Sequence, residues 1–257
     1  MKIIILATIV FISVICMQGC KKNMDYEPND FFEGRQLEIA KAIYEGDEAD
    51  LRKKLPLISK EELNKPAKAE MTLLFWAMTA TLGDNATPER LHIISDLVRA
   101  GADPLQPQPN GPGSPAELAM KSDKGVWIKA MLEGGLSPNA RDKRHNEAII
   151  FKSIWAKNTD SLKVLLDYGA DINIRDSLEN TVLISALDAH SYDHVILLLQ
   201  SGADSSIRGS SGWSMGNQLQ RYFDRGIRDN EERKKLEEIK SLLIQHGGQW
   251  PPSPVKK

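Results

Sequence analysis

The sequence predicts an all-α protein, a solenoid of about six helix–turn–helix repeats. A glycine recurs at a near-constant step, since Gly101, Gly135, Gly169 and Gly202 are 34, 34 and 33 residues apart. A mostly apolar run precedes each glycine, as expected of a buried helix that ends at a left-handed residue. A helix-start signal lies about 21 residues before several of these glycines, and such a fixed period indicates a repeat array.

The N-terminal segment has a different character. Lys2 is followed by an apolar run over residues 3–14, interrupted only by Thr8 and Ser13. A bilayer-spanning helix needs about 20 apolar residues, whereas a run of this length is typical of a secretory signal peptide. An uncleaved hydrophobic anchor is the alternative.

The end of this segment, Met17-Gln18-Gly19-Cys20, resembles the lipobox of bacterial lipoproteins, although Leu is commoner at the position of Met17. The resemblance implies that residues 1–19 are removed and that Cys20 is acylated. Cys16 would be lost with the signal peptide, so the mature domain would hold no disulfide and no thiolate metal ligand. By the same resemblance, Lys21 directs the protein to the outer membrane. We expect the lipid to anchor it there with the repeat domain facing the periplasm.

The predicted elements follow in order along the rest of the chain. Residues 20–33 are expected to form a lipidated tether broken by Pro28, and residues 34–250 the repeat domain. Residues 42–55 suit an N-terminal capping repeat, and the second repeat, from Thr72 to Gly101, carries an insertion near residues 82–88. Terminal repeats differ because they must present a polar outer face.

The third to fifth repeats begin at Ser114, at a degenerate copy over residues 148–153, and at Thr181. Ser or Thr at such a position can cap a helix. The sixth repeat runs from Ser214 to Gly247 with a charged insertion at residues 224–235, where charges of both signs indicate a solvated helix face. Residues 251–257, rich in proline, are expected to be extended.

These repeats resemble the ankyrin family. The cap-Pro-Leu-His-x-Ala start of that family is echoed at residues 72, 114 and 181, and its Gly-Ala-Asp ending occurs at residues 101, 169 and 202. The resemblance covers residues 34–250 and implies paired helices, projecting hairpins and a concave surface that binds another protein.

Composition narrows the function further. The net charge is −2, and removing residues 1–19, with one Lys and no acid, leaves 32 basic and 35 acidic residues, or −3. A general nucleic-acid binder would be strongly basic, so that class is excluded. We expect a monomer without a cofactor, metal or catalytic residue.

Two motifs could suggest chemistry. Gly212-Trp213-Ser214-Met215-Gly216 fits the G-x-S-x-G pattern of hydrolases, but that elbow needs a preceding buried strand, whereas residues 207–211 are polar. Ser214 lies where the repeat needs its cap. His190 and His194 could bind zinc from one helix face, but the register separates them onto two helices, which favours hydrogen-bonded loop histidines.

The register places candidate partner-binding residues on the hairpin tips and on the groove side of the first helices. Asp142 and Glu179 are among the tip residues that the register assigns, and Trp127 is assigned to the core. Interfaces favour Trp, Tyr and Arg. The candidates are Trp155, Trp213, Arg221, Tyr222, Lys152, Asp188, Arg144 and Arg208. Packing of Trp155 and Trp213 between repeats is the alternative.

Lipobox and repeats together resemble the immunity lipoproteins that neutralise type VI secretion phospholipase effectors. A periplasmic scaffold that supports an envelope enzyme, such as a catalase, is the alternative, and a Ser214 esterase ranks third. An immunity protein would matter only when its toxin is present, whereas loss of a scaffold would give a phenotype in monoculture.

Overall fold

The computed structural model describes residues 26–111 and 113–255. The chain forms two compact units, the first comprising residues up to Ala119 together with Val126–Ser137, and the second Met120–Gly125 together with the residues from Pro138 onward. The lipobox and Cys20 lie outside the described residues. None of the described helices has both the length and the apolar character needed to cross a membrane.

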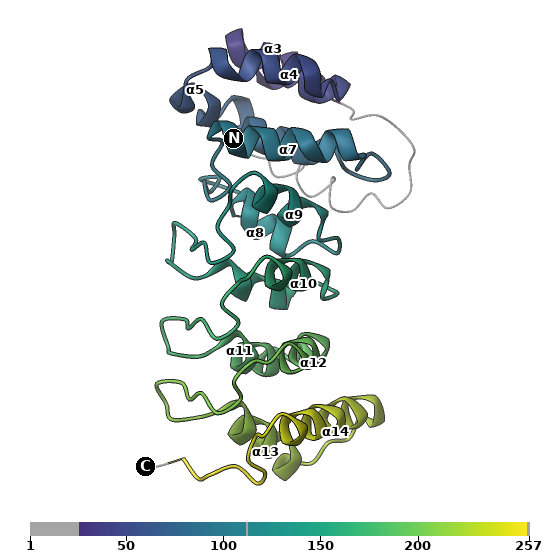
Figure 1. Cartoon of the computed structure of the whole chain (residues 1–257), viewed down its shortest axis with the longest axis vertical. Coiled ribbons are helices and arrows are strands. Elements are labelled where there is room, and N and C mark those ends of the chain that lie inside the picture. The colour runs from purple at the N-terminus through teal and green to yellow at the C-terminus, as the bar shows by residue number, and fades with distance from the viewer. Residues whose placement is uncertain (1–25, 112, 256–257) are drawn as a thin grey trace. The chain divides into compact units, whose positions relative to one another are not determined.

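The first unit holds three helix pairs and four short extra helices (Figure 1). The pairs are α3 (Gly34–Glu45) with α4 (Glu48–Lys54), α6 (Leu73–Thr79) with α7 (Pro88–Ala100), and α8 (Pro115–Met120) with α9 (Val126–Glu133). The extra helices are α2 (Pro28–Phe31), η1 (Leu55–Leu57), α5 (Lys60–Asn64) and η2 (Lys68–Glu70).

Trp76 is the centre of the first unit's core. Its ring lies 5.7 Å from that of Phe31 and 5.8 Å from that of Phe32, and its Nε1 donates to the carbonyl of Ala40 at 3.0 Å. Burying rings of this size contributes strongly to stability. From the sequence we expect residues 20–33 to form a tether outside the fold. Instead the folded part includes α2, because Phe31 and Phe32 at its end pack into this core.

Three further pairs make up the second unit. They are η3 (Ile149–Trp155) with α10 (Asp160–Asp167), α11 (Val182–Asp188) with α12 (Tyr192–Gln200), and α13 (Met215–Arg225) with α14 (Asn230–Gln245). The first helices pack on one another in the order η3, α11, α13, and α12 packs on α14. The predicted all-α repeat fold is confirmed, with six pairs in the described part of the chain.

The glycine stops behave as predicted. Gly101 ends α7 with φ 107°, and Gly202 follows α12 with φ 87°. A residue with a Cβ would be strained at such angles. The first helix of the fourth repeat differs from the prediction, because η3 is a 3-10 helix. Its run of isoleucines and aromatics has poor α-helical propensity.

Hairpin tips separate the repeats of the second unit and project from one side of it (Figure 1). Isolated bridges close them at Arg141 with Ala148, Arg175 with Thr181, and Arg208 with Ser214, and the described residues form no longer strand. Side chains of Asn join successive tips, since Asn139 Oδ1 accepts from the backbone N–H of Asp171 at 2.7 Å and Asn173 Oδ1 from that of Asp204 at 2.9 Å.

Candidate protein-binding surface

The three first helices of the second unit share one register. Trp155, Asp188 and Arg221 each lie seven residues after the position that precedes the helix, which is Ala148, Thr181 or Ser214. Because η3, α11 and α13 pack in sequence, this position forms a column along the groove side. The surroundings of the three residues differ: Asp188 and Arg221 line one hollow, whereas Trp155 is exposed outside it.

Four of the candidates line one hollow of about 520 Å³ over α11 and α13. These are Asp188, Trp213, Arg221 and Tyr222. The remaining lining residues come from the same two helices, from the tips before them and, for His190, from the turn after α11; they are Asn180, Ile184, His190, Ser211, Gln218 and Arg225. A hollow of this size lies within the range of ligand and peptide pockets. We call it the α11/α13 hollow.

Arg221 dominates the α11/α13 hollow. Its guanidinium carbon lies 5.4 Å from the centre of the Trp213 ring, a cation–π contact. Its Nε atom is buried and has no hydrogen-bond partner among the described residues. An unpaired buried N–H costs about 1–3 kcal/mol, so a ligand that accepts from it would recover that energy.

Asp188 lies beside Arg221 at the wall of the hollow. Gln218 Nε2 donates to its carboxylate. Partial burial raises the pKa of Asp188, while the charges of Arg221 and His190 act against that rise. Tyr222 donates to the carbonyl of Leu187 at 3.3 Å, and burial, followed by the charge of Asp188, raises the pKa of its hydroxyl.

A polar network behind the hollow was not predicted. His190 Nδ1 lies 2.9 Å from the hydroxyl of Tyr192, which donates to Glu232 Oε1 at 2.6 Å, and His190 Nε2 lies 3.3 Å from the hydroxyl of Tyr222. Burial and then Glu232 raise the pKa of Tyr192. The network joins α14 to the turn after α11. Only the tertiary fold brings these residues together, so repeat register alone could not identify them.

Arg225 also escaped prediction, although one signal pointed to it. It lies four residues after Arg221 on α13, the spacing at which helix side chains share a face. The hollow therefore has two guanidinium groups and one carboxylate.

Two of the exposed apolar side chains of this unit lie at the end of a first helix or on a hairpin tip. Trp155, at the end of η3, is 66% exposed, so it does not pack between repeats. Leu178, at a hairpin tip, is 60% exposed, and an apolar residue in an otherwise polar turn was the signal for it. Trp155 lies in the groove column but does not line the α11/α13 hollow.

The prediction for Lys152 is corrected by its contacts. Its side chain is only 14% exposed, with Nζ 2.6 Å from Glu147 Oε2 and 3.5 Å from Asp142 Oδ2. It therefore neutralises acids of its own repeat rather than facing a partner. Register places Lys152 on the groove side, but these local acids draw its ammonium inward.

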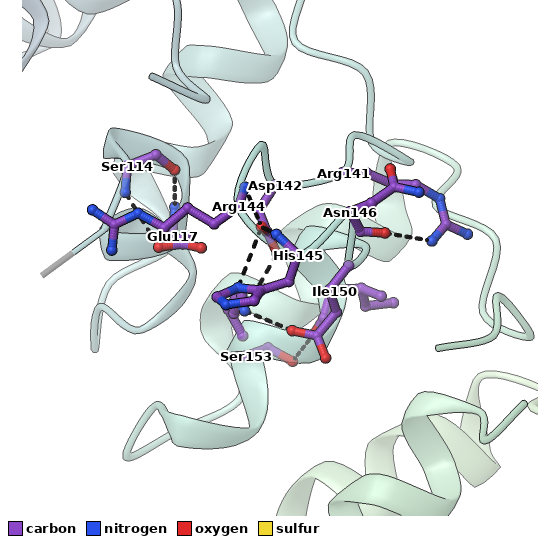
Figure 2. Close-up of polar contacts among 11 residues, drawn as sticks. Ser114, Glu117, Arg141, Asp142, Arg144, His145, Asn146, Ile150 and Ser153 are labelled. Atoms are coloured by element: carbon purple, nitrogen blue, oxygen red, sulfur yellow. Dashed lines mark hydrogen bonds and ion pairs between the residues drawn. The ribbon is translucent and has the colours of Figure 1, made fainter. Parts of the chain in front are cut away.

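Asp142 explains the geometry of the first of these tips (Figure 2). Its carboxylate is buried, and Oδ1 accepts from the backbone N–H groups of Arg144 at 2.9 Å and His145 at 2.6 Å. Burial opposes ionisation, but these hydrogen bonds and the charge of Lys152 lower the pKa of Asp142 overall. Asp142 was expected at the surface of the tip and instead holds the tip together. Arg144 is exposed on it.

Arg208 is held by hydrogen bonds within its own tip and to the C-terminal segment. Its Nη1 donates to the carbonyl of Gly212 at 2.6 Å and to Asn217 Oδ1 at 3.1 Å, and its Nη2 donates to the carbonyl of Ser253 at 3.4 Å. Asn217 Nδ2 also donates to Ser253 at 2.9 Å. The C-terminal segment, residues 249–255, is thus held against α13, where Pro252 lies beside Gly216. A larger hollow of about 640 Å³ beneath this segment includes Arg208 but none of the other candidates.

Known proteins share this architecture. The ankyrin repeat domain of Bcl-3 superposes with a TM-score of 0.59 at 23% identity, covering 82% of this chain and 86% of that one. The ankyrin repeat domain ABAYE2397 from Acinetobacter baumannii AYE gives a TM-score of 0.54 at 17% identity, covering 82% and 98%. The fold is the ankyrin-repeat fold.

Sequence relatives agree with the ankyrin fold but overlap it to different extents. The E3 ubiquitin-protein ligase KEG of Arabidopsis thaliana is 32% identical over 85 residues, 33% of this chain. FPV233 of fowlpox virus (strain NVSL), provisionally named an ankyrin repeat protein, is 34% identical over 62 residues. The matched regions span only 5% and 12% of these two proteins.

Protein PhlB of Serratia liquefaciens overlaps far more. It is 24% identical over 180 residues, which is 70% of this chain and 74% of PhlB. No protein-family model matches the chain.

Ser214 caps a helix in the ankyrin repeat, as predicted. It is buried, its Oγ accepts from the backbone N–H of Asn217 at 3.3 Å, and the Asn217 side chain returns to the Ser214 N–H at 3.1 Å. Ser114 and Glu117 form the same reciprocal capping box in the first unit (Figure 2). A buried hydroxyl engaged in this way is not positioned for attack on an ester.

The structure differs from the sequence-based predictions at three further residues. Thr181 occupies the cap position of α11, but its buried hydroxyl has no hydrogen-bond partner among the described residues. His194 lies in α12 and is buried rather than in a loop. Trp127 is only half-buried, and its Nε1 donates to Thr81 Oγ1 at 2.6 Å.

Across residues 26–111 and 113–255, no His, Asp and Glu side chains gather in a way that could hold a metal ion.

Proposed function

We propose that this chain binds another protein through the α11/α13 hollow and its flanking hairpin tips. The observation that carries the proposal is the convergence of Trp213, Arg221 and Tyr222 in one hollow. These three residue types dominate binding energy at protein interfaces because they bury large areas around a polar group. The exposed Trp155 extends the surface to the neighbouring repeats.

The partner we propose is a secreted toxin of the phospholipase class, which makes the chain an immunity protein. Two features support this choice. The lipobox at residues 17–20 would anchor the protein at a membrane, where a phospholipase acts, and the ankyrin stack offers an extended surface for binding another protein. Binding would block the active site of the toxin or its access to lipid.

Co-expression with the toxin encoded by the adjacent gene tests this proposal. Cells that receive the toxin in the periplasm should survive when the wild-type chain is present. Protection should be lost in the double variant Trp213→Ala with Arg221→Glu. Lys163→Glu is the matched control, since it makes the same charge change on the exposed face of the second helix α10. Unchanged killing in the presence of the wild-type chain would refute the immunity function.

We further propose that Cys20 carries lipid and holds the protein at the outer membrane, facing the periplasm. Several acyl chains on one residue would anchor the protein far more firmly than a single chain. Wild-type protein should incorporate labelled palmitate and sediment with outer membranes. Cys20→Ala should do neither, and palmitate incorporation by Cys20→Ala would contradict the assignment.

A further inference from the structure

We propose that the α11/α13 hollow recognises a carboxylate, the side chain of an Asp or Glu on the partner protein, and that Arg221 is its principal donor. This inference rests on the proposed protein-binding function and names the chemistry that the partner must present. Three independent features of the hollow lead to it.

The first feature is the unsatisfied donor. Arg221 Nε is buried and unpaired among the described residues, although buried guanidinium groups normally donate to an acceptor. The neighbouring acceptors do not pair with this atom, because Asp188 Oδ1 accepts from Gln218 and the carbonyl of Leu187 accepts from Tyr222. The Tyr222 hydroxyl shares a hydrogen bond with the Arg221 side chain that leaves Nε without a partner. A ligand with two acceptor oxygens would complete the donor set of Arg221.

The second feature is orientation. The Trp213 ring lies against the guanidinium of Arg221 at 5.4 Å. A cation–π contact restricts the plane of the guanidinium and reduces the entropy that is lost when a ligand binds. The planar fork of Arg matches a carboxylate with two parallel hydrogen bonds, a geometry that a lysine cannot provide.

The third feature is charge. Arg221 and Arg225 face the hollow with Asp188 as the only carboxylate among its lining residues, so the lining carries one net positive charge when His190 is neutral. One carboxylate balances this charge. A phosphate monoester would bring about −1.5 to −2 and leave an excess of negative charge.

The size of the hollow indicates where the carboxylate comes from. Its volume of about 520 Å³ exceeds the needs of a small free anion and suits a short segment of a partner chain. Trp213 supplies apolar surface beside the carboxylate site, as expected for a side chain that arrives on a protein loop.

The test uses the purified full chain and three probes, and it needs no natural partner. The probes are acetyl-Glu-Glu-Glu-amide, its neutral counterpart acetyl-Gln-Gln-Gln-amide, and phosphatidylglycerol vesicles. Arginine Nε–Hε signals are followed by NMR, and Arg221→Lys assigns the Arg221 signal because that variant lacks it. We expect a saturable shift of the Arg221 signal with the Glu peptide and none with the Gln peptide.

Trp213 fluorescence supplies the affinities. Arg221→Lys should weaken the Glu peptide about ten-fold, since it keeps the charge but loses the fork, and Arg225→Gln about three-fold. Lys163→Glu should leave the affinity unchanged. Equal shifts with both peptides, a shift with vesicles alone, or full affinity in Arg221→Lys would each overturn the carboxylate assignment. Failure of toxin protection with a positive peptide result would overturn the immunity function and leave the carboxylate site standing.

Discussion

Asp142 and Asp176 occupy the same position on successive hairpin tips, yet their surroundings differ. Each Oδ1 accepts two backbone N–H groups of its own turn, from Arg144 and His145 in one tip and from Leu178 and Asn180 in the next. Only Asp142 is fully buried and has a lysine, Lys152, opposite it. The pair therefore compares a buried aspartate that has a lysine partner with a more exposed aspartate that has none.

Asp142→Asn should destabilise the protein by about 2 kcal/mol and Asp176→Asn by about 1 kcal/mol, because hydrogen bonds to a buried charge are worth more than exposed ones. Urea denaturation at neutral pH measures both values. Because the pKa of Asp142 is lowered on folding, its contribution is present above the unfolded pKa of 3.8 and is lost as the pH falls through the folded value. Equal losses in the two variants would show that burial and Lys152 together add nothing to the contribution of Asp142.

His194 changes stability in the same direction as Asp142, but in a higher pH window. Burial lowers its pKa below the ordinary 6.5, so the unfolded chain takes up a proton first as the pH falls. The free energy of unfolding should therefore decrease from about pH 7 down to the folded pKa. His194→Gln should flatten the profile in this window, while the exposed His246→Gln should leave it unchanged. Identical slopes for wild type and His194→Gln would contradict the assignment.

At the scale of elements, α13 and α11 differ in how their N-termini are capped. Ser214 and Asn217 form a reciprocal capping box, whereas the hydroxyl of Thr181 is buried and unpaired among the described residues. The two positions are equivalent in the repeat, so each is a control for the other.

Ser214→Ala should destabilise the protein by about 1–2 kcal/mol, since it removes the cap and leaves the backbone N–H of Asn217 without its acceptor. Thr181→Val should be neutral or stabilising because it removes an unpaired polar group without changing volume. Thermal unfolding by circular dichroism compares the two. A larger loss in Thr181→Val than in Ser214→Ala would invalidate the capping argument. Ester hydrolysis abolished in Ser214→Ala would revive the esterase alternative.

Sequence periodicity predicts elements whose cause is local. The stops at Gly101 and Gly202 and the caps at Thr72, Ser114 and Ser214 follow from residue type and spacing, and the structure contains them all. Features with a tertiary cause were missed. Nothing in the tip sequence reveals that Lys152 turns toward Asp142, and nothing in residues 26–33 reveals that Trp76, more than forty residues later, will bury Phe32.

The candidate site divides in the same way. Register identified Asp188, Trp213, Arg221 and Tyr222, which the structure brings together in one hollow. It misplaced Arg208, because the carbonyl of Ser253 reaches that side chain from a segment that lies outside the repeat pattern. Periodicity describes what repeats share, and it is uninformative where a non-repeating segment contacts the stack.

At the scale of the whole molecule, the repeats within each unit contact their neighbours in sequence, so the stability of a unit should be a sum of local and nearest-neighbour contributions. Leu219→Ala in α13 removes a fully buried side chain and should cost about 2–5 kcal/mol. Hydrogen exchange should then increase over residues 205–255 with little change over residues 34–100. A uniform increase along the chain would indicate a single cooperative unit.

The asparagine contacts between hairpin tips have a consequence for protein engineering. Asn139 and Asn173 each accept the backbone N–H that opens the following repeat, at Asp171 and Asp204. Duplicating residues 171–203 in tandem would create one new seam, where Asn173 of the first copy would meet the opening N–H of Asp171 in the second. The chain thus already contains an interchangeable module, from which longer receptors with an additional groove segment could be assembled without designing a new junction.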